Sequence, residues 1–319
     1  MHNLNQNLKQ RILNSFNKKL KSLLDDIVIK DKKVFVTLEA NNNKDAEKLA
    51  VHKKECEEIL KKTNLFDEIF VTFIEKENKF KNVIAVSSCK GGVGKSTVAT
   101  NIALAYKRAG FTVGLLDADI YGPSVPKLLN INEKPDVNEK KKIIPVKKYG
   151  LETISIGFLI DDDKPVIWRG PMIQGALTQL IDEVQWSKLD YLVIDLPPGT
   201  GDAYLTILQK LKINKSLIVT TSQDLALSDT KKGINLMLKF DVPISGIIEN
   251  MSYFKCDECS KVHYLFGKGK VEKLAKQFNT NVVAKLPISN DLVILPNTDF
   301  SVNKKINTVF DDIVKKLKD

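Results

Sequence analysis

The segment SCKGGVGKST, residues 88–97, limits most strongly what this chain can fold into. It follows an apolar run at 83–86 and leads into a helical pattern that extends from residue 96 to residue 108. A strand, a glycine-rich loop and a helix in this order form a phosphate cradle, because glycines let backbone N–H groups close around phosphate oxygens and the helix N-terminus faces the anion. The segment therefore predicts a nucleotide site.

Two positions of this loop depart from a generic Walker loop. Cys89 stands where the generic pattern has glycine, and a second lysine, Lys90, precedes the usual one. Lys95 is expected to reach the terminal phosphates, and the Ser96 hydroxyl is expected to bind Mg²⁺. The residues predicted to hold the phosphates of ATP are Gly91, Gly92, Val93, Gly94, Lys95, Ser96 and Thr97.

Composition excludes several other classes of protein. The net charge is +10, but the lysines are scattered beside acidic residues without an aromatic-interleaved basic stripe, so no nucleic-acid partner is expected. No apolar run approaches the about 18 residues that span a bilayer, so stable membrane insertion is not expected. Four cysteines are too few for a disulfide scaffold. A cytoplasmic location is expected; an organelle of bacterial descent stays open, because the first two dozen residues are basic and free of acidic side chains until Asp25.

The chain divides into two parts by pattern. Residues 1–76 predict a small α/β domain, with a helix at 4–23, strands at 26–29 and 33–40, a helix at 44–62 and a strand at 68–74. A polar linker at 77–81 leads to an ATPase domain at 82–319. There, apolar strands at 83–87, 112–117, 153–158, 191–196, 216–221, 244–250 and 281–285 alternate with helices. This pattern predicts a P-loop α/β fold with a mostly parallel sheet covered by helices on both faces.

Carboxylates follow two of these strands. Asp117 and Asp119 end the strand at 112–117, and Asp195 ends the strand at 191–196, before the glycine-rich turn PPGTGD. Ligands of open parallel sheets bind at the carboxyl ends of strands. One member of the first pair can face the water shell of the metal and the other an attacking water, while Asp195 occupies the position of a Walker-B carboxylate.

Together these motifs resemble the Mrp/ApbC family of iron–sulfur cluster carrier ATPases, a group of deviant-Walker P-loop proteins. The matching motifs are SCKGGVGKST, DADIYGPS, WRGPM, DYLVIDLPPGTGD, ENMSYF, FGKG and LPI. The first domain resembles, less specifically, the small iron–sulfur assembly domain that is often fused ahead of this ATPase. The family's Asp-Gly-Pro pattern after LPI is weak here at 291–300, which leaves base recognition in that segment open.

The resemblance implies roles for particular residues. Lys90 would cross a homodimer interface to the partner's phosphates, and Asp119 would position the attacking water, so that Lys90, Lys95 and Asp119 form the catalytic set. Asp195 would hold Mg²⁺ through water, and Asn250 would contact the adenine. The partners implied are a second copy of the chain, apo iron–sulfur proteins and a cluster assembly scaffold.

A cysteine pair, Cys256 and Cys259, distinguishes this chain from a plain ATPase switch. Two thiolates three positions apart can share one metal centre, but they are half of a four-thiolate set. The resemblance implies that a homodimer completes it around a labile [4Fe–4S] cluster. Zinc is an alternative, with His263 as a third ligand, and a redox pair is a weaker one because the motif does not open a helix after a first strand.

The other two cysteines have no ligand role in this interpretation. A thiol at position 89 would lie near Lys90 and a helix N-terminus, conditions that lower a thiol pKa from about 8.5. One hypothesis is therefore that oxidation of Cys89 blocks nucleotide binding; the alternative is a tolerated small residue. Cys56 lies in a helical pattern with apolar neighbours and is expected to be a core thiol.

Three functions fit the sequence. The first is an ATP-dependent iron–sulfur cluster carrier. The second is a positioning ATPase of the MinD/ParA kind, in which the amphipathic segment 303–318 would lie on a membrane. Packing of that segment on the sheet explains the same pattern. The third is an ATPase switch with a structural zinc site.

Overall fold

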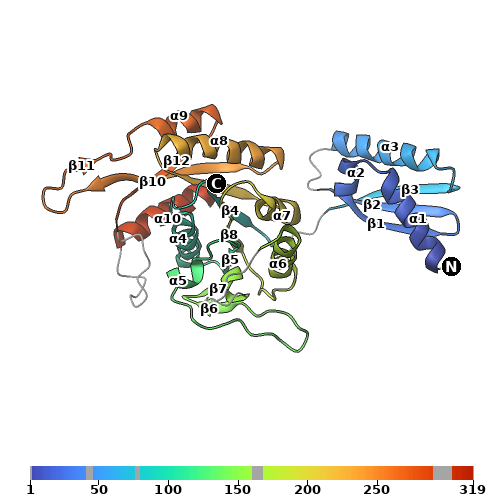
Figure 1. Ribbon diagram of the computed structural model, residues 1–319, viewed down its shortest axis with the longest axis horizontal. Helices are drawn as coiled ribbons and strands as arrows, with labels where there is room; N and C mark the ends of the chain where they lie inside the picture. The colour runs from blue at the N-terminus through green and yellow to red at the C-terminus, as the bar shows by residue number, and fades with distance from the viewer. Residues whose placement is uncertain (1, 41–45, 76–79, 160–167, 290–303, 319) are drawn as a thin grey trace. The chain divides into compact units, whose positions relative to one another are not determined.

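The structure is a computed structural model of the chain, and it describes residues 2–40, 46–75, 80–159, 168–289 and 304–318. The chain separates into two compact units, Met1–Lys79 and Phe80–Asp319 (Figure 1). Each unit has its own hydrophobic core. Most of the predicted linker, and all of the segment 291–300, lie outside the described residues.

The first unit is a three-stranded sheet with helices. Strand β2 pairs antiparallel with β1 and parallel with β3. Apolar residues of alternating strand positions meet the helices in a closed core that includes Ile27, Val34 and Val71. Cys56 is buried in this core, as expected. The elements are α1 (His2–Ser15), α2 (Lys18–Leu23), β1 (Leu24–Lys30), β2 (Lys33–Ala40), α3 (Ala46–Lys62) and β3 (Glu68–Glu75).

The single helix predicted at 4–23 is two helices. Helix α1 ends at Ser15, and Asn17 begins α2 by accepting a hydrogen bond from the Leu20 N–H at 2.8 Å. Asparagine competes with the helical backbone for N–H groups and is therefore favoured at helix starts. The apolar spacing continues across the break, because Ile12, Phe16 and Leu20 are all buried, and this continuity concealed it.

The second unit contains, within its described residues, a nine-stranded sheet in the order β11-β10-β9-β4-β8-β5-β7-β6, with β12 also paired to β10. The strands are β4 (Val83–Ser87), β5 (Val113–Asp117), β6 (Val146–Lys148), β7 (Leu151–Ser155), β8 (Tyr191–Asp195), β9 (Lys215–Thr220), β10 (Ile244–Lys255), β11 (Val262–His263) and β12 (Val282–Pro287). Pairs along the path from β7 to β10 are parallel, and β6 and β11 pair antiparallel at its ends.

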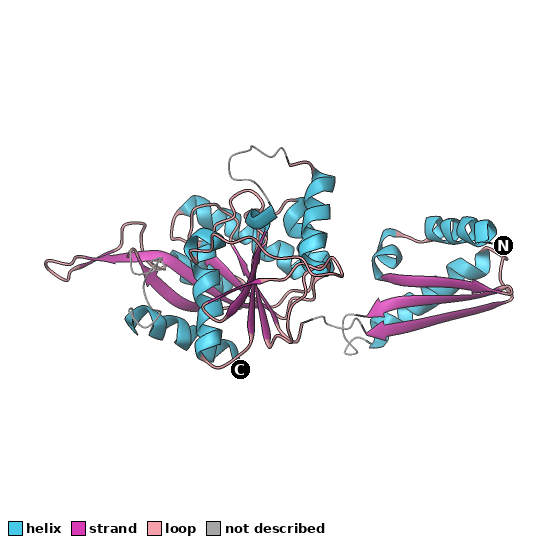
Figure 2. Ribbon diagram, turned by 90° about the horizontal axis from the view of Figure 1, so that it is seen from below, coloured by secondary structure: helices cyan, strands magenta, loops and turns pink. Residues whose placement is uncertain are grey.

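Helices cover both faces of this sheet, as predicted. Figure 1 shows α4 and α10 on one side of β4, β8 and β5, with α6 and α7 on the other, and Figure 2 shows helices on either side of the strands. Coverage on both faces explains why β4, β5 and β7 are buried along their whole length. The helices are α4 (Lys95–Arg108), α5 (Val125–Leu128), α6 (Gly170–Asp182), α7 (Asp202–Lys210), α8 (Asp224–Lys239), α9 (Lys270–Gln277) and α10 (Lys304–Lys318).

Two strand predictions differ from the structure, and two short strands were not predicted. The strand expected at 153–158 is β7, which ends at Ser155 and is followed by a 3₁₀ helix, Ile156–Leu159, where the Gly157 N–H donates to the Ser155 Oγ. The strand expected at 244–250 continues to Lys255 as half of a hairpin with β11. Strands β6 and β11 were not predicted, because strands of two or three residues are too short to show an alternation of apolar and polar side chains.

The amphipathic segment at the C-terminus packs inside the unit. Its apolar residues Phe310, Ile313 and Val314 are buried, and Arg108 of α4 binds Asp311 through Nε and Nη2 at 3.0 and 2.7 Å. The face that a membrane-lying helix would need is therefore used in the core. Among the described helices, none is long and apolar enough to cross a membrane.

Candidate functional site

The glycine-rich loop joins β4 to α4 and lines a hollow of about 430 Å³. Gly92 and Gly94 have φ values of +77° and +84°, which side-chain-bearing residues rarely adopt. At Gly94 a Cβ atom would also overlap the Asn250 side chain. At the base of the loop the Ser87 and Tyr204 hydroxyls are hydrogen-bonded at 2.9 Å. The predicted cradle residues thus lie at one site, at the N-terminus of α4.

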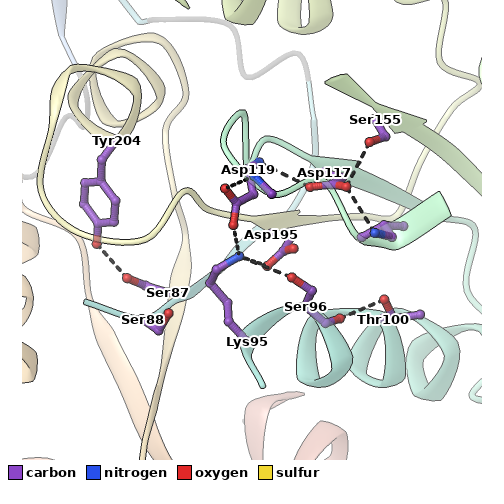
Figure 3. Close-up of polar contacts among 12 residues, drawn as sticks. Ser87, Ser88, Lys95, Ser96, Thr100, Asp117, Asp119, Ser155, Asp195 and Tyr204 are labelled. Atoms are coloured by element: carbon purple, nitrogen blue, oxygen red, sulfur yellow. Dashed lines mark hydrogen bonds and ion pairs between the residues drawn. The ribbon is translucent and has the colours of Figure 1, made fainter. Parts of the chain in front are cut away.

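Lys95 binds two of the predicted carboxylates. Its Nζ donates to Asp195 Oδ1 at 2.6 Å and lies 3.3 Å from Asp119 Oδ2 (Figure 3). Burial alone would lower the pKa of Lys95, but the charges of Asp195 and then Asp119 raise it above its usual value. The lysine is therefore a buried ammonium group whose present partners are carboxylates, and phosphate oxygens can compete for the same donors.

The two carboxylates after β5 have different roles in the structure. Asp119 lines the hollow and accepts a hydrogen bond from the Gly122 N–H. Asp117 is fully buried and holds the loop together, because Oδ2 accepts from Ser155 Oγ at 2.8 Å and from the Val125 N–H at 3.2 Å. Burial and the adjacent Asp195 raise the pKa of Asp117 to about 7. Asp119 is thus the member of the pair placed to act on a bound nucleotide.

The residues present fit a magnesium–nucleotide complex. Asp195 Oδ2 is buried and has no hydrogen bond within the described part of the chain. The Ser96 side chain lies beside the same carboxylate and helps to lower its pKa against the larger, opposite effect of burial. Oxygen donors of this kind suit Mg²⁺, so Ser96 and Asp195 would hold it, directly or through water, and it would neutralise phosphate charge there.

A second hollow, of about 370 Å³, adjoins the loop on the side of Gly94 and Thr97. The Asn250 Nδ2 donates to the Val93 carbonyl at 2.8 Å, and its buried Oδ1 has no partner among the described residues. An unpaired amide oxygen can accept from an exocyclic amino group such as that of adenine. Asn250 is the residue that was predicted to contact the adenine. The apolar wall of this hollow was not predicted; it consists of Met251, Phe266, Leu286, Pro287 and Ile288.

Lys90 lies at the edge of the loop rather than in its base. Its Nζ donates to Gln223 Oε1 at 3.4 Å, just before α8 begins. The contact is long and partly buried, so the lysine is held loosely by its own chain. Gln223 was not foreseen, because a contact between residues so distant in the sequence leaves no local pattern.

Cys256 and Cys259 lie in the turn between β10 and β11, and Figures 1 and 2 show this hairpin extending beyond the rest of its unit. The turn is closed by the Ser260 N–H, which donates to the Cys256 carbonyl at 2.8 Å. Backbone N–H groups, first that of Cys259 and then that of Glu258, lower the pKa of the Cys256 thiol. Amides directed at one sulfur stabilise a thiolate, the form that binds metals.

Within the described residues, the zinc alternative finds no third ligand. His263 is exposed on β11, opposite Phe254 of β10. Among the described residues, no group of three or more His, Cys, Asp or Glu side chains could hold a metal ion. The pair, with Cys256 half-buried and Cys259 exposed, therefore needs donors from outside the described residues.

Cys89 agrees with the second of its two interpretations, a tolerated small residue. Its Sγ packs against Gly233 of α8, where a Cβ atom would overlap it. Burial raises the pKa of Cys89 to about 11, outweighing an opposite effect of the Gly233 backbone. The hypothesis of an oxidation-sensitive thiolate at the loop is therefore not supported, and the side chain is a packing residue.

Cys89 should consequently react slowly with thiol reagents. Because the thiolate is the nucleophile, alkylation of Cys89 in the folded protein should rise about tenfold per pH unit from pH 7 towards pH 11. Cys256 should level off at lower pH, since its pKa is lowered. Mass spectrometry of iodoacetamide adducts measures both in one sample. Saturation of Cys89 below pH 9, or peroxide-sensitive ATP turnover that Cys89→Ser abolishes, would restore the redox hypothesis.

The comparisons with known proteins agree with this arrangement. The family of ParA-type NUBPL iron-transfer P-loop NTPases matches residues 79–318. The chain belongs to this family. An "iron-sulfur cluster carrier protein" of Pseudomonas fragi is 50% identical over 214 residues, which are 66% of this chain and 75% of that protein. A protein of the same name from Aquifex aeolicus is 48% identical, and the match spans 66% of this chain and 59% of that longer protein.

A solved structure extends the family comparison to the nucleotide. A nucleotide-binding protein from Archaeoglobus fulgidus, in complex with ADP and with cobalt found in it, is 37% identical. It superposes with a TM-score of 0.59 over 74% of this chain and 88% of its own. The resemblance inferred from the motifs and the predicted P-loop fold are thereby confirmed.

Proposed function

We propose that this protein is an ATP-dependent iron–sulfur cluster carrier, which binds a [4Fe–4S] cluster as cargo and passes it to apoproteins. The observation that carries the proposal is that one strand, β10, holds Asn250 at the nucleotide hollow and leads directly into Cys256, the first residue of the turn that follows. Its relatives named as cluster carriers support the same function. A plain nucleotide switch has no need of an exposed thiol pair at the end of such a strand.

In this proposal the loop residues bind and hydrolyse ATP. Gly91–Thr97 backbone amides hold the phosphates, Lys95 exchanges its carboxylate partners for phosphate oxygens, and Asp119 orients the attacking water. Lys90 leaves Gln223 and reaches the phosphates of a second protomer. Ser96 and Asp195 would hold Mg²⁺, which would neutralise phosphate charge when bound. Lys95, Ser96 and Asp119 line the hollow, which supports their assignments. Asp195 is hydrogen-bonded to Lys95, and Lys90 lies at the edge of the same loop.

The cysteine turn binds the cargo through two copies of the chain. Two thiolates supply half of the ligands that a [4Fe–4S] cluster takes, so a homodimer about a two-fold axis supplies four. The exposed position of the turn allows both the approach of the second copy and release to an acceptor. Apo iron–sulfur proteins and an assembly scaffold are the corresponding partners, in the cytoplasm or an organelle of bacterial descent.

Anaerobic reconstitution with iron and sulfide tests this proposal. The wild-type protein should take up about four irons per dimer, with absorbance in the thiolate-to-iron region, because two pairs of thiolates complete one cluster. Cys256→Ala/Cys259→Ala should lose this uptake, whereas Cys56→Ala, the matched loss of a buried thiol, should retain it. Zinc in the purified protein together with cysteine-independent iron uptake would contradict the proposal.

A further inference from the structure

Met251 has an unusual backbone conformation for its place in the fold. It lies within β10, yet its φ is +53°, in the left-handed region that residues other than glycine, asparagine and aspartate rarely adopt. Conformations of this kind persist only where the surrounding structure imposes them. Its neighbours in sequence are Asn250, which contacts the glycine-rich loop, and Ser252, which is buried.

The pairing of β10 changes at this residue. Pairing with β9 ends at Glu249, opposite Thr220. Against β12, Glu249 pairs with Lys285 and Tyr253 with Pro287, so residues 250–252 lie opposite Leu286 alone. Beyond Tyr253, whose carbonyl accepts from the Ile288 N–H at 2.7 Å, the strand pairs, among the described residues, with β11 alone. Met251 therefore lies between the part of β10 inside the sheet and the part that carries the cysteine turn.

The Met251 side chain also lines the hollow beside Gly94 and Asn250. A bound base would contact it, together with the Leu286–Ser289 segment of the same wall. A ligand shifts an equilibrium only by contacts that differ between its states. Met251 is placed to make such contacts, because it lines the hollow in which the base would lie and its backbone lies between the sheet and the hairpin.

We propose that Met251 is a positioning residue that couples occupancy of the base hollow to the placement of the Cys256–Cys259 turn. Met251, in its left-handed backbone conformation, is the joint between the sheet and the hairpin. Occupancy of the hollow fixes this joint, and with it the pairing of Tyr253 and the orientation of the hairpin. An empty hollow leaves the joint free to relax, so that the turn samples other orientations. The inference rests on the proposed function only in naming why the turn must be placed; the coupling itself can be measured without a cluster.

Hydrogen exchange on the cluster-free full chain tests the joint. The probe is MgADP at saturation, and the readout is exchange at Ile288, Cys256 and Ser260, whose N–H groups bond across the joint or inside the hairpin. In wild type, MgADP should slow this exchange at least about fivefold, the lower end of typical allosteric couplings. Peptides of the first unit serve as the internal reference.

Two isomeric substitutions isolate the backbone conformation. Met251→Leu keeps an unbranched Cβ and an apolar contact with the base, and should keep the MgADP response. Met251→Ile has the same composition as leucine but is β-branched, which makes left-handed φ far less favourable, and should reduce the response to less than about twofold. Thermal unfolding of both variants, and ADP titration to set saturation, accompany the measurement.

Several outcomes would overturn the inference. An isoleucine variant that responds like the leucine variant, or a wild-type hairpin that ignores MgADP, would do so. If Met251→Ile does not fold, Met251→Gly decides: glycine adopts the same φ freely but also many others and has no side chain, so a wild-type response would refute the joint. Iron uptake is separate. Wild type without cysteine-dependent iron uptake refutes the carrier, whereas uptake with no exchange response refutes only the joint.

Discussion

Replacing Lys95 by methionine should both abolish useful nucleotide binding and destabilise the free protein. In the structure this ammonium group neutralises Asp195 and Asp119 in a buried setting. Removing one partner of a buried ion pair costs about 3–5 kcal/mol, because the remaining charge stays buried. A hydrogen bond to a charged group contributes about 1.5–3 kcal/mol. Loss of one such bond from Lys95 to a phosphate should therefore lower ADP affinity about tenfold to 100-fold. Isothermal titration and chemical denaturation measure the two effects.

The two effects of this substitution can be separated with a second change. Lys95→Met/Asp195→Asn removes the uncompensated carboxylate, so stability should partly recover while nucleotide binding stays lost. Lys239→Met, at an exposed position in the last turn of α8, is the matched control and should leave both unchanged. A Lys95→Met protein of wild-type stability would show that the ion pairs contribute little, and wild-type ADP affinity would contradict the placement of the phosphates.

Replacing Lys90 by alanine should suppress ATP turnover while sparing ADP binding. A cationic residue supplied by a partner to the transferring phosphate is worth about 10³-fold or more in turnover. Lys90 Nζ makes a long hydrogen bond to Gln223 of its own chain, so loss of this side chain should change ADP affinity by less than about threefold. Steady-state phosphate release at saturating MgATP measures the first effect, and ADP titration the second.

Mixing two inactive variants tests whether Lys90 acts across the dimer. A Lys90→Ala protomer has an intact phosphate-binding loop but lacks the lysine that reaches its partner's phosphates. A Lys95→Met protomer has that lysine but a defective phosphate-binding loop. The mixed dimer then contains one complete site, so turnover should reappear on mixing. Gln223→Ala, which frees Lys90 without removing it, is the control and should retain turnover. Absence of recovery in a mixture shown to contain mixed dimers would place Lys90 in its own protomer's site.

The parts of the fold that local pattern could reveal were largely predictable. Three short, largely apolar runs predict parallel strands. They end in Ser87, Asp117 and Asp195, which mark the carboxyl ends of the strands, where the site lies. The glycine-rich loop fixed the start of α4 to within one residue of its position in the structure. These features depend on neighbours in the sequence, and sequence spacing records them.

Features that depend on distant contacts were not predictable in the same way. The neighbours of Cys89 in the sequence left a reactive thiol and a tolerated small residue both open, and the contact with Gly233, far along the chain, decides for the second. The left-handed backbone conformation at Met251 accompanies the unequal pairing of β10 with β12. The residue type does not indicate this conformation, since glycine or asparagine would be the usual choice. The ion pairs of Lys95 likewise follow from strand order.

The central claim, that one chain couples ATP to delivery of a cluster, is tested most directly by a transfer assay. Reconstituted protein is mixed anaerobically with the apo form of a [4Fe–4S] enzyme, whose recovered activity reports arrival of the cluster. Transfer should require Cys256 and Cys259, and MgATP should change its rate at least about fivefold in wild type and not in Lys95→Met. Equal recovery with Cys256→Ala/Cys259→Ala, or a rate that MgATP leaves unchanged, would contradict the account.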